Sequence, residues 1–131
     1  MSEARQIIVL CGGLSSEREV SLRSGQAVAE VLPGARLVEL TADALPDWLD
    51  AARHVVFPDL HGGWGEYGRA QAELEARGVA FAGWAAAANR LCMEKVATKQ
   101  AMRAAGVPAI PAVAVAGAAK PADAAPVAAL G

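Results

Sequence analysis

Clusters of basic residues are missing from this sequence. Its 12 lysines and arginines are scattered among 14 aspartates and glutamates, and the net charge is −2. Nucleic-acid-binding domains carry a basic patch, so nucleic acid is not expected as the main partner. No stretch approaches the ~20 apolar residues of a membrane-spanning helix, and no membrane association is expected. The first five residues lead straight into an apolar run without the pattern of a secretory signal, which predicts a cytoplasmic protein.

Cysteine is also scarce. Cys11 and Cys92 are far apart in the sequence, and neither has the spacing of a metal or redox motif. Both have apolar neighbours. The pattern predicts two buried thiols in a reducing compartment.

What the sequence does contain is a regular alternation of short apolar runs and helical patterns. With 131 residues, 54% of them hydrophobic, the chain is long enough for one packed domain. The pattern predicts strands at 6–11, 36–40, 54–60 and 79–82, and helices at 17–32, 45–52, 68–77, 85–93 and 94–105. In the first helix, Val20, Ser24, Ala27, Val28 and Val31 recur at helical spacing. This order predicts an open, mainly parallel, Rossmann-like α/β sheet with helices on both faces.

The last 20 residues are low in complexity and poor in large apolar side chains. Residues 112–115 could begin another strand. Two interpretations stay open for this region: a flexible tail, or the start of a second domain near Met93. The second interpretation divides the chain into an α/β domain at 1–92 and an incomplete further part at 93–131.

Glycine-bearing loops follow three of the predicted strands: GGLSSERE, LHGGWGEYG and AGWAA. Ligands of open α/β sheets bind beyond the carboxyl ends of the strands, so these loops predict a site. Neither G-x-G-x-x-G nor a P-loop sequence is present, which argues against a Rossmann-type dehydrogenase.

The first loop carries a capping-box pattern, Ser16-Glu17-Arg18-Glu19, which makes Ser16 the predicted N-cap and Glu17 the first helical residue. Gly12 and Gly13 allow a tight turn and close approach of a ligand. Free amides at the helix start attract an anion, and the Glu17 carboxylate attracts a cation. Together they suit a zwitterion such as an amino acid. The alternative is that Glu17 only complements the helix dipole.

The second loop contains four glycines within seven residues, starting at Gly62, and is able to lie against a ligand. His61 follows a strand end and could donate to a carboxylate. Glu66 could cap the next helix or orient a partner. The alternative for His61 is a loop histidine bonded to the backbone.

Three motifs in order resemble the D-alanine–D-alanine ligases. They are GGLSSEREVSLRSG, LHGGWGEYGRAQAELEARGVAFAG and CMEKVATKQAMRAAGVPAIPAV. The resemblance implies the N-terminal, pre-ATP-grasp domain of a ligase that joins two D-alanines for peptidoglycan synthesis. The implied reaction uses ATP and Mg²⁺ and passes through an acyl phosphate of the first D-alanine. The nucleotide and metal sites are then expected mainly beyond this chain, and the 131 residues alone are expected to be inactive.

The resemblance also implies roles for individual residues. Glu17 matches the glutamate that meets the ammonium of the first D-alanine, and His61 matches the histidine near its carboxylate. Val20 and Ser21 match positions that support the same substrate, and Lys95 matches a lysine on the ATP side. No residue of this chain is assigned a catalytic or metal-ligating role. A homodimer is expected because the family commonly dimerises through this domain.

The sequence departs from the family pattern at two positions. Tyr67 stands where an aspartate is usual, and Trp84 stands where a small serine is usual. Both could reshape the substrate pocket, or these residues could simply pack with Trp64. Two alternatives therefore stay open: an ATP-grasp ligase for another amino acid, and a non-catalytic amino-acid-binding module.

Overall fold

The chain folds into alternating strands and helices, as the sequence pattern predicts. The computed structural model describes residues 4–112. Its elements are β1 (Gln6–Gly12), α1 (Arg18–Val31), β2 (Arg36–Leu40), β3 (His54–Pro58), α2 (Gly63–Glu66), α3 (Arg69–Ala76), β4 (Ala80–Phe81), α4 (Ala86–Met93) and α5 (Lys95–Ala104). Within residues 4–112, none of the helices is long and apolar enough to cross a membrane.

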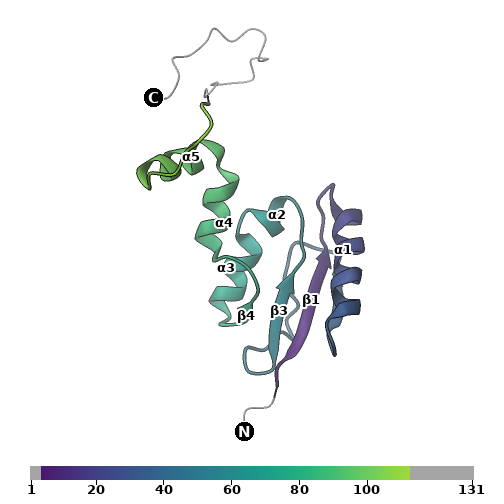
Figure 1. The fold of residues 1–131 in the computed structure, drawn as a ribbon. Coiled ribbons are helices and arrows are strands. Elements are labelled where there is room, and N and C mark those ends of the chain that lie inside the picture. The colour runs from purple at the N-terminus through teal and green to yellow at the C-terminus, as the bar shows by residue number, and fades with distance from the viewer. Residues whose placement is uncertain (1–3, 113–131) are drawn as a thin grey trace. The chain divides into compact units, whose positions relative to one another are not determined.

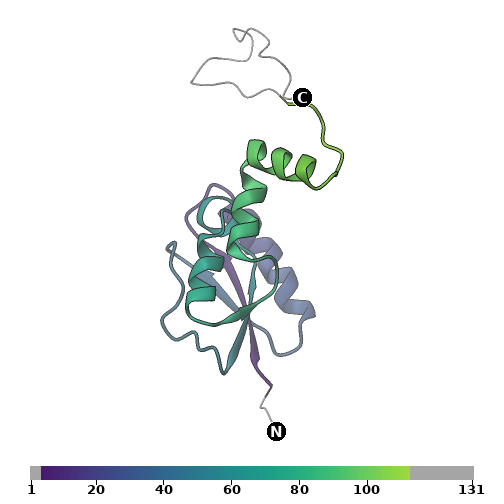
Figure 2. The same cartoon turned by 90° about the vertical axis from the view of Figure 1, so that its left-hand side faces the viewer.

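The four strands form one parallel sheet in the order β2-β1-β3-β4. Helix α1 lies on one face of this sheet, and α3 and α4 lie on the other (Figures 1 and 2). The predicted fold class, a parallel α/β sheet with helices on both faces, is confirmed. The carboxyl ends of β1 and β3 are neighbours, so the loops after them meet at one edge.

The central strand β1 is buried on both faces, and its side chains alternate between two environments. Ile8 and Leu10 belong to the main hydrophobic core on the side of α3. That core also contains Leu40, Leu45, Leu49, Val56, Leu60, Trp64, Ala70, Leu74 and Val79. Cys11 is also fully buried, and it lies against Gly25 of α1.

Helix α1 packs on the sheet through small residues rather than through its valines. Ser21 and Gly25 are its buried residues. A Cβ added at Gly25 would lie 2.6 Å from the Cβ of Cys11. The predicted apolar face was wrong at Val20 and Val31, which are 51% and 75% exposed, and at Ala27, which is also exposed. The helix comes so close to β1 that only small side chains fit between them.

The helix predicted at 45–52 was wrong, since this segment forms turns. Its Leu45 and Leu49 still reach the core. The carboxylate of Asp50 accepts hydrogen bonds from the amides of Ala52 and Arg53 at 2.7 and 3.3 Å. A side chain that takes these amides competes with the helical pattern.

Within the predicted strand 54–60, β3 ends at Pro58, where the sequence predicts the pairing to stop because proline has no amide for the ladder. One helix was not predicted: the short α2 lies in the glycine-rich segment that was predicted to be a loop. Trp64, only 9% exposed, anchors α2 in the core.

The contacts divide the chain into two units, Met1–Met93 and Glu94–Gly131. In the second unit, the Nζ of Lys99 on α5 donates to the carbonyl oxygen of Ile110 at 2.7 Å. The strand considered at 112–115 falls almost entirely outside the described residues. That the second unit begins an ATP-grasp domain stays a prediction.

Candidate functional site

The loop after β1 turns the chain into α1 by a different device from the one predicted. Helix α1 begins at Arg18, with Glu17 as its N-cap and no side-chain cap bond. The predicted capping box at Ser16 was therefore wrong. The neighbouring Ser15 instead stabilises the turn before the helix, because its Oγ accepts a hydrogen bond from the amide of Glu17 at 3.1 Å.

Ser15 also joins this loop to the loop after β3. Its hydroxyl donates to the carbonyl oxygen of His61 at 2.6 Å. The Glu17 carboxylate lies close to the same loop, since a Cβ added at Gly62 would be 2.8 Å from Glu17 Oε2. Gly62 has a φ of +69° and gives Glu17 the space that a side chain would fill. Glu17 and His61 thus lie at the same edge of the sheet.

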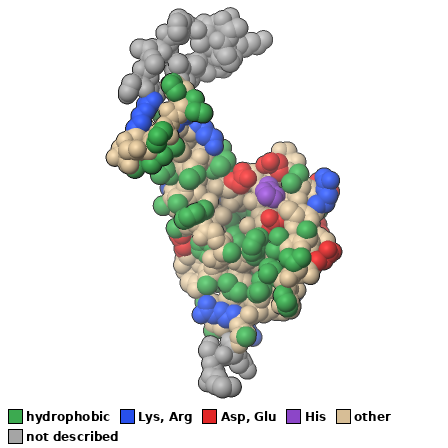
Figure 3. Space-filling model, in the orientation of Figure 1, with side chains coloured by type: hydrophobic (Ala, Val, Ile, Leu, Met, Phe, Trp, Pro, Cys, Tyr) green, Lys and Arg blue, Asp and Glu red, His purple; other side chains and the backbone are tan. Residues whose placement is uncertain are grey.

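The imidazole of His61 is surrounded by oxygen atoms. Its Nε2 lies 3.2 Å from Ser24 Oγ and 3.8 Å from Asp59 Oδ1, and its Nδ1 lies 3.9 Å from Glu66 Oε1. Figure 3 shows acidic side chains gathered around a histidine on this face of the molecule. The His61 side chain is 32% exposed and the Glu66 side chain 37%, so both can be reached from solvent.

Ser21 of α1 connects β1 to the loop after β3 through hydrogen bonds beneath this edge of the sheet. It is fully buried, and its hydroxyl accepts from the amide of Gly12 at 2.8 Å while donating to the carbonyl oxygen of Asp59. Ser21 therefore ties β1, α1 and the loop after β3 together. It was predicted to contact the substrate, but its hydroxyl is already used within the protein. Val20 lies beside it in the first turn of α1 and is exposed.

Arg18 fixes the start of α1 to the ends of β1 and β2. Its guanidinium donates to the carbonyl oxygens of Gly13 and Leu40 at 3.0 and 2.8 Å, and it pairs with Glu39. Three other residues of the site, Ser15, Ser24 and Asp59, were not singled out from the sequence. The position of Ser15 two residues after the glycine pair was an available signal for Ser15. Asp59 had been placed inside a strand, and Ser24 had been assigned to the helix face by spacing alone.

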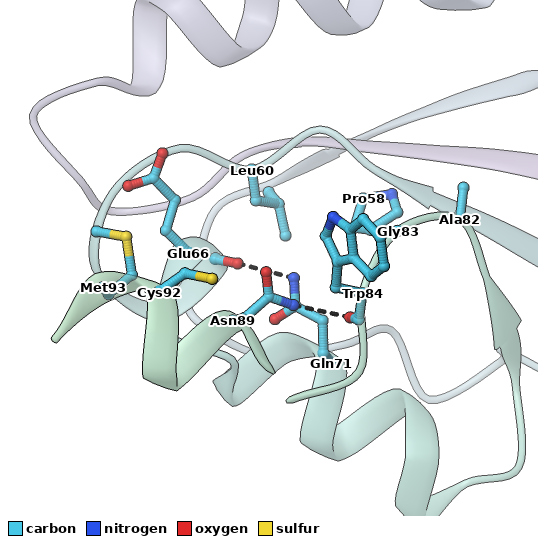
Figure 4. Close-up of a pocket in the computed structure, with 11 residues that line it drawn as sticks. Pro58, Leu60, Glu66, Gln71, Ala82, Gly83, Trp84, Asn89, Cys92 and Met93 are labelled. Carbon is cyan, nitrogen blue, oxygen red and sulfur yellow. Dashed lines mark hydrogen bonds between the residues drawn. The ribbon is translucent and has the colours of Figure 1, made fainter. Parts of the chain in front are cut away.

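A pocket of about 310 Å³ lies on the other side of Glu66. Figure 4 shows Trp84 and Glu66 on different sides of it, with Gln71 and Asn89 between them. The Nε2 of Gln71 donates to the carbonyl oxygen of Gly65 at 3.0 Å, and the Nδ2 of Asn89 donates to that of Trp84 at 2.8 Å. Trp84 is 77% exposed, so a large aromatic surface borders this pocket.

The aromatic residues of the two loops border two different hollows. Trp64 is buried and Tyr67 is 43% exposed, and both border one hollow, whereas Trp84 borders the pocket described above. That all three pack together stays a prediction. Cys92 differs from its prediction, since it is exposed on α4, whereas Cys11 is buried.

Lys95 is the only residue of this chain that was predicted to bind ATP. Lys95 is the first residue of α5 and is exposed. Among residues 4–112, no group of three or more histidine, cysteine or acidic side chains could hold a metal ion.

These features define a parallel α/β domain with a carboxylate and an imidazole at one edge of its sheet. No family model matches the chain. It is 44% identical over 112 residues to the D-alanine–D-alanine ligase of Roseobacter denitrificans, covering 82% of this chain and 35% of that protein.

Solved structures give the same result. The D-alanine–D-alanine ligase of Aeromonas hydrophila superposes with a TM-score of 0.68 at 30% identity, over 84% of this chain and 50% of that one. The Bacillus anthracis D-alanine–D-alanine ligase complexed with ATP gives a TM-score of 0.62 at 29% identity, over 79% of this chain and 37% of that one.

The resemblance seen in the motifs is thus confirmed. The chain is homologous to the D-alanine–D-alanine ligases over most of its own length, and it spans about a third of the length of the curated relatives it matches.

Proposed function

We propose that this chain carries the first amino-acid site of an ATP-dependent D-alanine–D-alanine ligase. In this site the Glu17 carboxylate receives the ammonium of D-alanine, and the imidazole of His61 faces its carboxylate. The observation that carries the proposal is the Ser15 bridge, which places Glu17 and His61 at one edge in a chain homologous to these ligases.

The geometry supports a small zwitterion rather than a large ligand. The hollow between the two loops, lined by Gly13, Ser15 and His61 among others, holds only about 10 Å³. That volume is about enough for one water molecule. An amino acid is therefore proposed to rest on the open edge above it, with its ammonium toward Glu17 and its carboxylate toward His61.

The remaining parts of the proposed reaction are ATP, Mg²⁺ and a second D-alanine. ATP supplies the phosphoryl group that activates the carboxylate of the first D-alanine. Lys95 is proposed to face the nucleotide, whereas the metal is proposed to be held outside residues 4–112. The proposed setting is the cytoplasmic synthesis of the peptidoglycan precursor by a homodimer, without nucleic-acid or membrane partners.

Calorimetric titration of the 131-residue chain with D-alanine tests the proposed site. Saturable binding is expected, and Glu17→Gln is expected to weaken it ~10- to 100-fold, because a hydrogen bond to a charged group contributes ~1.5–3 kcal/mol. The matched control is Glu19→Gln. Glu19 lies two residues after Glu17 and is also exposed, and its substitution is expected to leave the affinity unchanged. Equal effects of the two variants would refute the role of Glu17.

The same titration separates the alternatives. A panel of D-amino acids tests altered specificity, since a preference for a side chain larger than methyl would point to the surroundings of Trp84. Phosphate release that depends on ATP and D-alanine, measured on the 131-residue chain, would overturn the expectation that these residues alone are inactive. Binding without turnover, even when the chain is supplied with the rest of such a ligase, would favour the non-catalytic module.

A further inference from the structure

Ser24 of α1 lies between two residues of the loop after β3. Its Oγ is 2.5 Å from Asp59 Oδ2 and 3.2 Å from His61 Nε2. The hydroxyl has one hydrogen and can therefore satisfy only one acceptor as a donor. The acceptor of this hydrogen determines the tautomer of His61, that is, which ring nitrogen carries a hydrogen.

The contacts favour Asp59 as the acceptor. Ser24 Oγ also lies 3.0 Å from the carbonyl oxygen of Val20 and 3.3 Å from that of Ser21. The Asp59 carboxylate is nearer than either and carries a charge, which makes it the stronger acceptor. Its side chain is only 13% exposed, so water competes little for it.

With its hydrogen directed at Asp59, Ser24 presents only lone pairs to His61. The facing Nε2 must then be a donor. The second carboxylate oxygen of Asp59, 3.8 Å from Nε2, also favours an N–H at this position. The other nitrogen, Nδ1, lies on the side of Glu66, at 3.9 Å from its Oε1.

We propose that Asp59 and Ser24 are positioning residues that keep a hydrogen on Nε2 of His61 in both its neutral and its cationic form. Nδ1 is then the atom offered to a ligand, as an acceptor in the neutral ring and as a donor to a carboxylate in the cationic one. The statement about the ligand rests on the proposed function, whereas the position of the hydrogen does not.

Nitrogen NMR of the histidine rings in the 131-residue chain tests this proposal. The chain has two histidines, and the second provides an internal control. His54 Nδ1 accepts from the amide of Asp50 at 3.0 Å, so its neutral ring also carries the hydrogen on Nε2. At a pH where the rings are neutral, both are expected to show an acceptor-type Nδ1 and a donor-type Nε2.

Two variants should change His61 alone. In Asp59→Asn the new amide can donate to Ser24, which frees the serine hydrogen for Nε2. In Ser24→Ala the bridge is removed. Both are expected to lose the pure acceptor-type Nδ1 signal of His61 and to show a mixture of tautomers, with His54 unchanged. Ser24→Thr keeps the hydroxyl and is expected to restore the wild-type signal.

A hydrogen on Nδ1 of neutral wild-type His61 would overturn the proposal. So would unchanged His61 signals in both Asp59→Asn and Ser24→Ala, provided that their amide spectra show folded proteins. Adding D-alanine to the same samples keeps the two proposals distinguishable. The expected tautomer without any response to D-alanine supports the positioning role and counts against the proposed function.

Discussion

The hydroxyl of Ser15 donates to the carbonyl oxygen of His61 at 2.6 Å, and this single bond joins the loop after β1 to the loop after β3. The same oxygen accepts from the amide of Glu17. One short side chain thus fixes the backbone of both residues that are proposed to bind the amino acid. Its position follows from the parallel pairing of β1 with β3, which brings the two loops to one edge.

Ser15→Ala is expected to weaken D-alanine binding several-fold and to lower the free energy of unfolding by ~1–3 kcal/mol. The substitution removes two hydrogen bonds, one to the carbonyl oxygen of His61 and one from the amide of Glu17, and a typical hydrogen bond contributes ~0.5–1.5 kcal/mol. Calorimetry measures the affinity, and urea unfolding measures the stability. Ser16→Ala is the matched control, because Ser16 is exposed beside it and its predicted cap is not formed. An affinity loss as large in Ser16→Ala would contradict the role of Ser15.

Ser21→Ala is expected to lower the free energy of unfolding by ~2–5 kcal/mol. The substitution leaves the amide of Gly12 and the carbonyl of Asp59 without their present partner, and each unsatisfied buried group costs ~1–3 kcal/mol. Urea denaturation at equilibrium measures the change. Arg23→Ala, on the exposed side of the same helix, is expected to change it by less than ~1 kcal/mol.

Gly25→Ala is expected to destabilise the protein by ~1–3 kcal/mol, the usual cost of overpacking. In an exposed helix the same substitution would stabilise by ~1 kcal/mol, because alanine favours the helix. The sign reverses here because the new Cβ would lie 2.6 Å from the Cβ of Cys11. The melting temperature of Gly25→Ala is compared with that of Gln26→Ala, a substitution at an exposed neighbouring position. A raised melting temperature in Gly25→Ala would mean that α1 does not lie so close to β1.

Cys11 should make the protein less stable at alkaline pH. Burial raises the pKa of its thiol above the ordinary value of 9.0, and the charges of Glu39 and Asp59 raise it further, while Arg18 opposes them. The folded state therefore favours the neutral thiol. Its contribution is fully present below the pKa of the unfolded chain and is lost as pH rises through the pKa of the folded one.

Urea unfolding between neutral pH and pH values above that ordinary pKa measures this loss. The alkaline decline is expected to be shallower in Cys11→Ala than in the wild type, because that variant has no thiol to ionise at this position. Cys92→Ser is the matched control and should keep the wild-type slope. In the folded wild type, a thiol reagent should modify the exposed Cys92 at once and reach Cys11 only on unfolding. Equal slopes in all three proteins would contradict the burial effect.

Strand positions followed closely from the sequence. The strand at 36–40 was predicted at its observed bounds, and the first strand was missed by one residue. Apolar β-branched runs between turn residues determine such strands locally. The failures had two different causes. At α2 a tertiary contact overrides the local pattern, because Trp64 packs in the core. At 45–52 the cause is local, because the Asp50 side chain binds the amides of its own turn.

The sequence by itself determined the alternation of strands and helices, the parallel sheet and the two loops that carry Glu17 and His61. These depend on hydrophobic periodicity and on glycine, which act over a few neighbouring residues. Only the tertiary structure decided that Ser15, Ser24 and Asp59 belong to the same site. Their partners lie 35 or more residues away along the chain in the contacts Ser15–His61 and Ser24–Asp59. Such pairs come together through strand pairing and close helix packing, which no local pattern specifies.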